Sequence, residues 1–547
     1  MHDRASSRMA AMASKSWLPR WGRWRKVVRS VLADMVALLS YSDWAESGSL
    51  KRSTSFIIME PLPESAMPPP LPLALPDLDA PLHRRLYLAL RDSILDGRLA
   101  EGAALPSSRG LAAQLGVARN TVLAAYDLLA AEGFTEAHRG SATRVAARHP
   151  LVGAAPAGEE APPSPLPPRT RAWGAAPPMI LVRDPFRPFA PGVPDLAAFP
   201  HAEWRRVLGR LWRRPPLELM GGIDPLGHAP LRHAIAEHLG RSRAVRCDPA
   251  QVMIMGGSQQ ALDLVARVLL EPGEAVLVED PCYGGLTGVL RAAGAQVQAV
   301  AVDGQGFDPE LAERQCPSAR LTFVTPSHQF PTGATMPLSR RLALIHWAER
   351  VGGWVIEDDY DSDFHHAGSP TASLQGLDRG GRTLYLGTFS KSMFPGLRLG
   401  WLVVPPPLLP AFVAARRIAD MAPAGLTQAA MAAFMTEGHF GAHLRRMRTL
   451  YGQRRRALLD AAPRILGPNL PVTAGEAGLH AILWLPAGCD DFQAAEAARA
   501  RGLAPSPLSF HRVTKGCPGL VLGYGNLAGS SLEEALQRLR EAIITLI

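Results

Sequence analysis

Uninterrupted hydrophobic runs, paired cysteines and lysine are all scarce in this chain of 547 residues. The best apolar candidate, residues 27–40, carries Arg29 and Asp34, whereas a membrane span needs about 20 predominantly apolar residues. The five cysteines are scattered and contain no CxxC pair. We therefore expect no membrane span, no disulfide framework and no metal site, and the cysteine usage fits a reduced, cytoplasmic compartment.

Lysine contributes only five of the 58 basic residues, and arginine supplies the rest. The formal net charge of +9 permits a nucleic-acid partner without establishing one. With 47% hydrophobic and 20% charged residues, the composition is globular. The length exceeds what one ordinary hydrophobic core supports, so two or more domains are expected.

Residues 1–78 differ from the rest of the chain. They combine a basic, tryptophan-rich stretch at 17–30 with a proline-rich stretch at 67–76. One interpretation is an amphipathic segment that touches a membrane or nucleic acid. The other, which we favour, is an extension that is disordered or not translated, with synthesis beginning near Met59 or Met67. A targeting peptide is disfavoured because no small-residue cleavage site follows a clean apolar core.

Residues 79–146 have the pattern of a small helical domain. A first helix is predicted because apolar residues recur every four positions and so share one face; these are Leu82, Leu86, Leu90 and Ile94. Pro106 and Ser107 then offer a turn and an N-cap for a short helix that ends at Gly116. A further helix closes at Gly133, and residues 134–146 indicate two short strands around a glycine turn. This order is that of a winged helix-turn-helix domain.

Polar residues occupy the positions where such a domain touches DNA. Arginine, asparagine and threonine begin its last helix, and these side chains can pair with base edges in the major groove. Serine and arginine open the preceding helix, where phosphates are held, and arginine and glycine form the tip of the hairpin. Taken singly, each residue is explained as a solvated helix cap, but their joint order favours DNA binding. The candidates are Ser107, Arg109, Arg119, Asn120, Thr121, Arg139 and Gly140.

The remainder of the chain reads as a linker and a larger domain. Residues 147–185 are rich in alanine and proline, which predicts a semi-extended linker. In residues 186–547, helical stretches alternate with short apolar runs such as AVLVED, WVIEDDY and LGWLVVP. Because these runs are apolar on both faces, they predict buried parallel strands in an α/β domain.

The segment GTFSKSMFPGLRLG at 387–400 places a lysine, hydroxyls and an arginine in one loop after such a run. The amine of Lys391 can form an imine with an aldehyde cofactor such as pyridoxal 5'-phosphate. That cofactor also needs cations, hydroxyls and amides around its phosphate. Its ring nitrogen needs a carboxylate, its phenolic oxygen a donor and its ring a flat neighbour.

The sequence offers a candidate for each of these needs. The phosphate ligands are expected where a strand passes into a helix and in the lysine loop itself; they are Gly257, Ser258, Gln259, Thr388, Ser390 and Arg398. Asp358 can face the ring nitrogen, Tyr360 the phenolic oxygen and Tyr283 the ring. His328 lies at another strand end, where α/β proteins collect ligands. A surface lysine, a turn motif or a helix cap explains each motif alone, and the joint order carries the prediction.

Both halves resemble known families on these motifs. Residues 81–146 resemble the winged-helix domain of the GntR regulators, through LPSSRGLAAQLGVARNTV and the AYDLLAAEG that follows it. Residues 186–547 resemble the fold-type I (class I) aminotransferases. Together they resemble the MocR branch of the GntR regulators, which includes GabR and PdxR. The resemblance implies a pyridoxal phosphate-binding transcription factor that binds promoter DNA as a head-to-tail homodimer and responds to an amino acid or amine.

Four positions depart from the pattern of these relatives. Ala118 stands where serine is usual, and the hairpin reads SAT instead of SGT. Gly222 replaces a tyrosine that contributes to a phosphate site in relatives. Val521 replaces an arginine just before LGY, so a clamp for a substrate carboxylate is not evident. Arg512 is a weak candidate for that role.

Three functions remain open from the sequence. The first is a regulator that senses pyridoxal phosphate, an amino compound, or both, through an aldimine at Lys391. The second is an active aminotransferase with an accessory DNA-binding domain, since Lys391, Asp358 and Tyr360 suffice in type for proton transfer. The third is an α/β domain with vestigial motifs and no cofactor. The linked DNA-binding domain favours the first, with at most weak transaminase activity.

Overall fold

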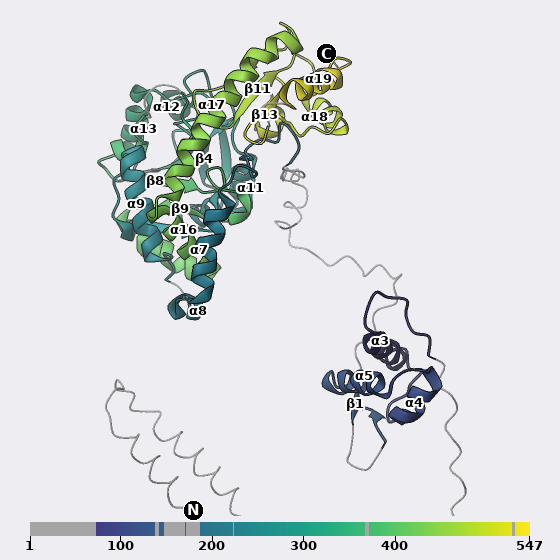
Figure 1. The fold of residues 1–547 in the computed structure, drawn as a ribbon. Coiled ribbons are helices and arrows are strands. Elements are labelled where there is room, and N and C mark those ends of the chain that lie inside the picture. Colours follow the sequence, from purple (N-terminus) through teal and green to yellow (C-terminus); the bar gives the residue numbers. More distant parts are fainter. Residues whose placement is uncertain are drawn as a thin grey trace, which may run out of the picture. The chain divides into compact units, whose positions relative to one another are not determined.

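The computed structural model of the protein describes residues 73–136, 142–146, 170, 186–222, 224–366, 371–527 and 531–546. The chain divides into two compact units, Met1–Ala161 and Pro162–Ile547, which are drawn in Figure 1. Most of the predicted N-terminal extension and of the predicted linker lies outside the described residues. Among the helices that are described, none is both long enough and apolar enough to cross a membrane.

The described part of the N-terminal unit contains three helices and a short hairpin. The helices are α3 (Leu82–Leu95), α4 (Ser108–Leu115) and α5 (Arg119–Ala131), and the hairpin pairs β1 (Thr135–Glu136) with β2 (Arg144–Val145). Leu86, Leu90 and Ile94 are buried as the periodicity predicts, whereas Leu82 is 40% exposed. The three buried residues pack against side chains of α4 and α5 in one core.

Local sequence accounts for the helix ends in this unit. The Ser107 hydroxyl accepts a hydrogen bond from the backbone N–H of Gly110 at 3.1 Å, which makes it the N-cap of α4. Gly116 ends α4 in the left-handed region, where glycine has no steric penalty. The Tyr126 hydroxyl of α5 donates to the Pro106 carbonyl at 2.7 Å and fixes the turn before α4. The predicted winged helix-turn-helix order is confirmed.

The C-terminal unit contains a seven-stranded mixed sheet in the order β3-β9-β8-β7-β6-β4-β5. The neighbours from β8 through β7, β6 and β4 to β5 pair in parallel. The strands are β3 (Val252–Met255), β4 (Ala275–Asp280), β5 (Gln296–Ala301), β6 (Leu321–Val324), β7 (Trp354–Asp359), β8 (Thr383–Thr388) and β9 (Gly400–Val403).

One strand of this sheet corrects the sequence prediction. The run LGWLVV was expected to be a parallel strand, but β9 is antiparallel to both β8 and β3. The reason lies in the connection: between Thr388 and Gly400 the chain forms only the short 3-10 turn Pro395–Leu397. A parallel pair needs a longer crossover, usually a helix, whereas a short loop suffices for antiparallel neighbours.

Helices cover both faces of the large sheet. One face packs on α10 (Ser258–Leu269), α11 (Gly284–Ala292) and α15 (Leu409–Ala419). The other packs on α9 (Ala229–Arg243) and α16 (Gly425–Thr436) at one end, and on α12 (Pro309–Gln315), α13 (Leu338–Val351) and α14 (Leu374–Leu377) at the other. The helices α7 (His201–Arg213) and α8 (Leu217–Gly221) pack beside α16.

A second, antiparallel sheet forms the C-terminal lobe in the order β10-β11-β13-β12. Its strands are β10 (Val472–Thr473), β11 (His480–Trp484), β12 (Ser506–Pro507) and β13 (Gly519–Gly523), and its helices are α18 (Asp491–Ala500) and α19 (Leu532–Ile543). The long helix α17 (His439–Leu466) runs from α16 to α19 (Figure 1).

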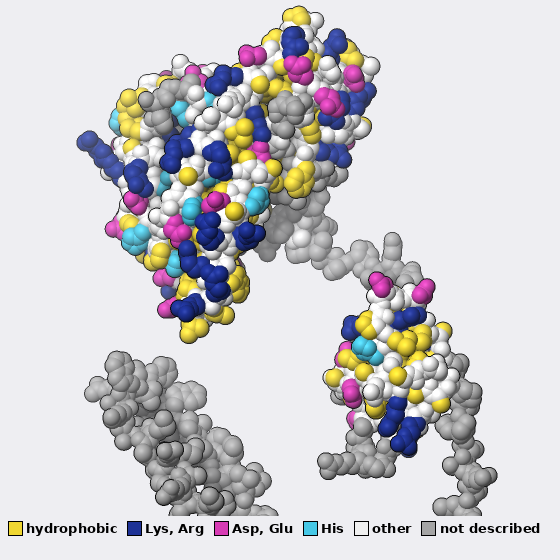
Figure 2. All heavy atoms as spheres, viewed as in Figure 1, with side chains coloured by type: hydrophobic (Ala, Val, Ile, Leu, Met, Phe, Trp, Pro, Cys, Tyr) yellow, Lys and Arg dark blue, Asp and Glu magenta, His cyan; other side chains and the backbone are white. Residues whose placement is uncertain are grey.

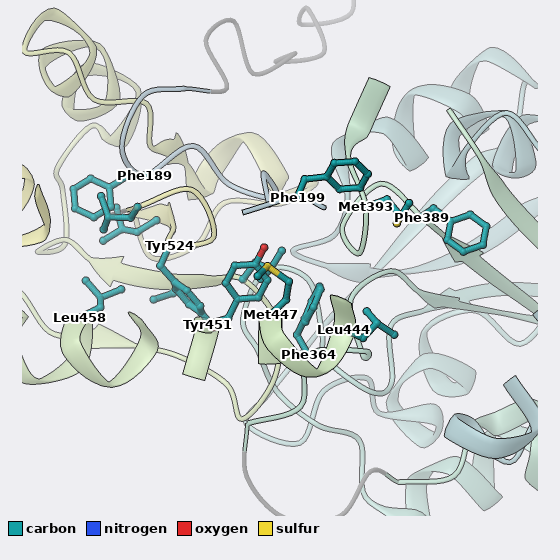
Figure 3. Packing of buried hydrophobic residues seen from close by; sticks show 14 of the residues in the cluster. Phe189, Phe199, Phe364, Phe389, Met393, Leu444, Met447, Tyr451, Leu458 and Tyr524 are labelled. Atoms are coloured by element: carbon teal, nitrogen blue, oxygen red, sulfur yellow. The ribbon is translucent and has the colours of Figure 1, made fainter. Parts of the chain in front are cut away.

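A single hydrophobic core joins the two sheets. It includes Val252 and Trp401 of the large sheet as well as Leu520 and Leu539 of the C-terminal lobe. Figure 3 shows Tyr451, Met447 and Leu444 of α17 in this core, beside Phe364. The Phe364 and Tyr451 rings meet edge to face with centroids 4.9 Å apart. The position of α17 therefore links the two lobes through buried side chains.

Candidate functional site

A glycine and an arginine meet at the start of α10. Gly257 is the N-cap residue of α10 and has a φ of +107°. A Cβ atom at this position would lie 3.1 Å from a terminal nitrogen of Arg398, so glycine allows the guanidinium to approach the backbone. Ser258 and Gln259 follow in the first turn, where free backbone N–H groups and the helix dipole attract anions.

The side chain of Gln259 is engaged elsewhere. Its amide nitrogen donates to the Gly285 carbonyl at 3.0 Å, so Gln259 offers the anion its backbone N–H alone. Two hydroxyls are the other predicted phosphate ligands. Those of Thr388 and Ser390 lie 3.0 Å apart at the end of β8. Six sequence-predicted phosphate ligands are thus distributed over the start of α10 and the loop between β8 and β9.

Lys391 lies in the same loop and points at a backbone carbonyl. Its Nζ donates to the carbonyl oxygen of Gly192 at 2.9 Å. Burial lowers the pKa of Lys391, while the negative charges of Asp361 and Asp358 oppose the shift. A lower pKa leaves more of the amine neutral, which is the form that attacks an aldehyde. The sequence analysis did not find Gly192, although a glycine in PGVPD was the available signal.

Asp358 is the carboxylate next to this amine. Its Oδ1 atom is shielded from solvent and has no hydrogen-bond partner among the described residues. Burial, followed by the charges of Asp359, Asp361 and Glu279, raises the pKa of Asp358 to about 7, and Lys391 lowers it. An unpaired buried carboxylate is costly, so this position favours a ligand that brings a cation or an N–H donor.

Tyr360 and His328 form a hydrogen-bonded group with an acid that the sequence analysis missed. The Tyr360 hydroxyl lies 3.0 Å from His328 Nδ1, and both carboxylate oxygens of Asp361 lie 3.1 Å from the same nitrogen. His328 is 2% exposed, and Cβ atoms at Gly475 and Gly478 would collide with its ring. This packing fixes the imidazole beside the tyrosine. The acid that the sequence analysis missed is Asp361. It lies in DYDSD, three residues after Asp358, and this proximity could have indicated it.

His480 of β11 lies next to this group. Its ring centroid is 5.0 Å from that of His328. Ligand atoms of His328, Asp361 and His480 lie within 4.8 Å of one another, which is a spacing that a metal ion can use. Two of these residues already form hydrogen bonds to other groups: Nε2 of His480 lies 2.9 Å from the Pro331 carbonyl oxygen, and Asp361 bonds His328 Nδ1.

Tyr283 contacts the site through Phe330. It is the N-cap residue of α11, and its ring meets that of Phe330 edge to face at 6.5 Å. Its pKa is raised by burial and by the charge of Asp358, and lowered by Arg398. Both charged groups of the site therefore act on the Tyr283 hydroxyl.

The positions that depart from the relatives have distinct environments. Val521 of β13 is buried with Ile482 and Leu508 in an apolar cluster. Arg512 packs on Gly516, where a Cβ would lie 2.5 Å from the guanidinium carbon. Gly222 is exposed at the end of α8, with open space around its Cα. The apolar cluster at Val521 gives no support for a carboxylate clamp at that strand position.

The candidate DNA contacts lie on the N-terminal unit. Arg119 and Asn120 are exposed in the first turn of α5, and Arg109 is exposed in the first turn of α4. Arg119 Nε donates to the Ser108 hydroxyl at 3.2 Å, so the starts of both helices lie side by side. Thr121 is partly buried. The predicted contacts Arg139 and Gly140 lie outside the described residues.

Comparison with known proteins follows this division of the chain. Residues 82–145 match the family of bacterial regulatory proteins of the gntR type, and residues 218–515 match the aminotransferase class I and II family. The chain is 39% identical over 475 residues to the "Probable rhizopine catabolism regulatory protein MocR" of Rhizobium meliloti, covering 86% of this chain and 95% of that protein.

Two further comparisons give a relative that matches most of the chain and a solved structure that matches a smaller part of it. The pyridoxine biosynthesis transcriptional regulator PdxR of Corynebacterium glutamicum is 31% identical, over 86% of this chain and 98% of its own. Among solved structures, LysN, an α-aminoadipate aminotransferase of Thermus thermophilus, matches with a TM-score of 0.63 at 30% identity. That match covers 69% of this chain and 97% of LysN.

Proposed function

Because this chain belongs to the MocR branch of the gntR family, with an aminotransferase class I and II domain after its winged helix, we propose that it is a transcriptional regulator that binds pyridoxal 5'-phosphate at Lys391 and promoter DNA through α5. The observation that carries the proposal is the unpaired Asp358 carboxylate beside the buried Lys391 amine. The cytoplasm, where the promoter lies, is the proposed location.

Three features of the site support the choice of cofactor. The Asp358 Oδ1 atom has no described partner and fits a protonated ring nitrogen. The Gly257 backbone faces the Arg398 guanidinium with no room for a side chain, and this pair fits a phosphate. The Lys391 amine has a lowered pKa and fits an aldehyde. These are the three groups by which proteins hold and activate pyridoxal phosphate.

Each residue has a task in this site. Pyridoxal phosphate, when bound, supplies an aldehyde that condenses with amines and a protonated ring that withdraws electrons. Gly257, Arg398 and the two hydroxyls of Thr388 and Ser390 hold the phosphate. Asp358 keeps the ring nitrogen protonated. Tyr360 would donate a hydrogen bond to the phenolic oxygen, and Tyr283 would cover the ring. His328 positions Tyr360.

Regulation then follows from competition between amines. An incoming amino compound would compete with Lys391 Nζ for the aldehyde, and the Gly192 carbonyl offers the lysine amine an acceptor when it is not bound to the cofactor. Such exchange shifts the protein between two conformations only when the ligand binds one of them more tightly. The effector is therefore an amino acid or amine whose remaining atoms contact the protein differently in the two states.

We include a head-to-tail homodimer in the proposal. Large apolar side chains are exposed on α7 (Trp212) and α8 (Leu217 and Met220), and at the end of α15 (Ile418) and just after it (Met421). The two groups belong to one region, since Leu219 packs against Gly425 at the start of α16. Exposed apolar patches of this kind mark protein interfaces. Light scattering of the purified chain measures the mass directly.

Substitution of Gly192 tests the placement of Lys391. Gly192 has a φ of +72°, and a Cβ there would lie 2.4 Å from Lys391 Nζ. The left-handed conformation costs a non-glycine residue roughly 1–2 kcal/mol, and the clash adds to it. We expect Gly192→Ala to weaken the apparent affinity for pyridoxal phosphate at least ~10-fold, measured by titration of the imine absorbance.

Gly381→Ala is the matched control for this variant. Gly381 has a similar φ of +66° but nothing within 4 Å of a Cβ, so it carries the strain without the clash. Equal cofactor affinity in the two variants would show that Gly192 does not position Lys391.

The experiment that tests the proposed function is a gel shift on the intergenic DNA upstream of the gene. It is run with and without pyridoxal phosphate at two salt concentrations, because non-specific phosphate binding falls steeply with salt. Salt-resistant binding that depends on the cofactor is expected. Arg119→Ala is expected to cost about 1–3 kcal/mol of specific binding, whereas Arg98→Ala, in an exposed loop after α3, leaves binding unchanged. Absence of sequence-specific binding under every condition contradicts the proposal.

An active aminotransferase is the second candidate, favoured by the set Lys391, Asp358 and Tyr360. Multiple turnover with a common amino acid and oxo-acid pair is the result that selects it. A single slow half-reaction, or none, leaves the regulator in place. The apolar surroundings of Val521 favour the latter result.

A further inference from the structure

A cleft of about 830 Å³ opens between α9, α16, α17 and the loop that follows β7. It is separate from the cofactor site, because Lys391, Asp358 and Arg398 are not among its lining residues. Figure 2 shows basic and histidine side chains interspersed on the face where α9, α16 and α17 lie in Figure 1. None of the functions proposed above uses this cleft.

Three guanidinium groups of the cleft are available to a ligand. Arg445 of α17 is exposed and has no ionic partner among the described residues. Arg448, one turn later, donates its Nε to the backbone carbonyl of Asp363, which leaves both terminal nitrogens free of described partners. Arg241 of α9 pairs only with the exposed Glu237 at 3.1 Å, and surface pairs of this kind contribute about 0–1 kcal/mol.

The acidic residues of the cleft do not neutralise these cations. Asp363 already pairs with His238 of α9 at 3.2 Å. Burial would raise the pKa of Asp363, but His238, Arg448 and Arg243 together lower it. Glu237 is exposed to solvent. The cleft therefore keeps an excess of positive charge in a concave part of the surface, where guanidinium groups can form charge-assisted hydrogen bonds with an anion.

One wall of the cleft is apolar. Phe440 and Leu444 of α17 are buried, and Met435 of α16 lies beside them in the lining. The Phe440 ring meets His238 edge to face with centroids 5.4 Å apart. A ligand for this cleft thus combines anionic oxygens with an apolar or flat portion. A DNA backbone, which is polar along its length, does not use such a wall.

We propose that this cleft binds a small organic polyanion, a phosphorylated or polycarboxylated metabolite, as a second ligand site of the protein. Guanidinium groups bind phosphate and carboxylate with the same paired geometry, so the two sources share one chemistry. The volume suits a molecule of metabolite size, since ligand pockets range over about 300–1,000 Å³.

The cleft adjoins the cofactor site through shared elements. The loop after β7 carries Tyr360 and Asp361 into that site and Ser362 and Asp363 into the cleft. Arg243 lines the cleft and donates its Nε to Asp359 at 2.8 Å. Its guanidinium also bonds the hydroxyl of Ser327, the neighbour of His328. A ligand in the cleft therefore contacts the outer side of the segments that hold Tyr360.

Calorimetric titration of the full-length chain tests the proposal. The probes are inorganic phosphate, citrate and adenosine diphosphate, each added with and without saturating pyridoxal phosphate. We expect citrate or adenosine diphosphate to bind at one site per chain, and the better probe shows whether carboxylates or phosphates are preferred. Arg445→Ala is expected to weaken that binding at least ~10-fold, and the variant should fold because Arg445 is exposed and unpaired.

Arg456→Ala is the matched control, since Arg456 is also exposed on α17 but does not line the cleft. It is expected to bind the probe as the unmodified chain does. Four results overturn the proposal: no heat with any probe, equal weakening in both variants, loss of binding when pyridoxal phosphate is added, or displacement of the probe by unrelated duplex DNA. The third would assign the probe to the cofactor site, and the fourth would assign the cleft to nucleic acid.

Discussion

The Lys391→Ala variant is expected to show no imine absorbance after pyridoxal phosphate is added, at any concentration. In the unmodified chain, the Nζ of Lys391 is the amine on which the charges of Asp358 and Asp361 act. Lys515, the other lysine in the described part of the chain, does not belong to the site. Cofactor affinity is expected to fall without vanishing, because Gly257, Arg398 and the hydroxyls of the lysine loop still hold the phosphate. Any effect of an amine on promoter binding should be lost with the imine. Absorbance spectra and gel shifts measure the two consequences separately.

Lys515→Ala is the control for this prediction, since Lys515 is exposed and belongs to no part of the site. It should keep the absorbance of the unmodified chain. An amine response that persists unchanged in Lys391→Ala would show that the imine is not the switch, although it would leave DNA binding by α5 intact.

The Arg243→Ala variant is expected to lose about 3–5 kcal/mol of unfolding free energy, which is the usual cost of removing one partner from a buried ion pair. The side chains of Arg243 and Asp359 are 5% and 2% exposed, and they pair at 2.8 Å. Arg243 also donates to the Thr371 carbonyl at 3.0 Å. Burial disfavours the charge on Arg243, but Asp359, Tyr385 and Glu357 outweigh it and raise the pKa. Removal of the guanidinium leaves Asp359 buried without its cation.

Urea unfolding followed by circular dichroism measures this loss, with Arg267→Ala as the control. Arg267 pairs with Asp263 at 2.7 Å on the exposed face of α10, and such helix pairs are worth about 0.3–0.5 kcal/mol. A loss below ~1 kcal/mol for Arg243→Ala would contradict the buried pair. Tyr385 donates to the same Asp359 oxygen at 2.6 Å, so the carboxylate keeps one partner in the variant.

The sequence predicted those parts of the site that follow local rules. Lys391 and Asp358 were proposed because each comes at the end of an apolar run, and parallel strands collect their carboxyl ends at one edge. Gly257 was found because a glycine between a strand and a helix indicates a phosphate loop. The helix pair of the N-terminal unit was found from its cap, Ser107, and its closing glycine. All these signals lie within about ten residues of the position that they predict.

The parts that the sequence did not predict depend on contacts between distant segments. Gly192 is 199 positions before Lys391, and Arg243 is 116 positions before Asp359. No periodicity or cap connects such pairs, because they meet only when the sheet has formed. The prediction that β9 is parallel was wrong for a related reason. An apolar run shows that a strand is buried but does not give its direction, which depends on the connection before it.

The shortage of lysine has a chemical consequence if the protein binds an aldehyde cofactor, as we propose. Residues 79–146 contain no lysine, and Lys391 and Lys515 are the two in the described residues. Reactive aldehydes in the cell modify exposed amines without selection, and here few amines compete with Lys391 for them. The basic surfaces consist of guanidinium groups, which stay charged at physiological pH. Acetylation, which neutralises lysine, therefore has no target on the proposed DNA-binding helices.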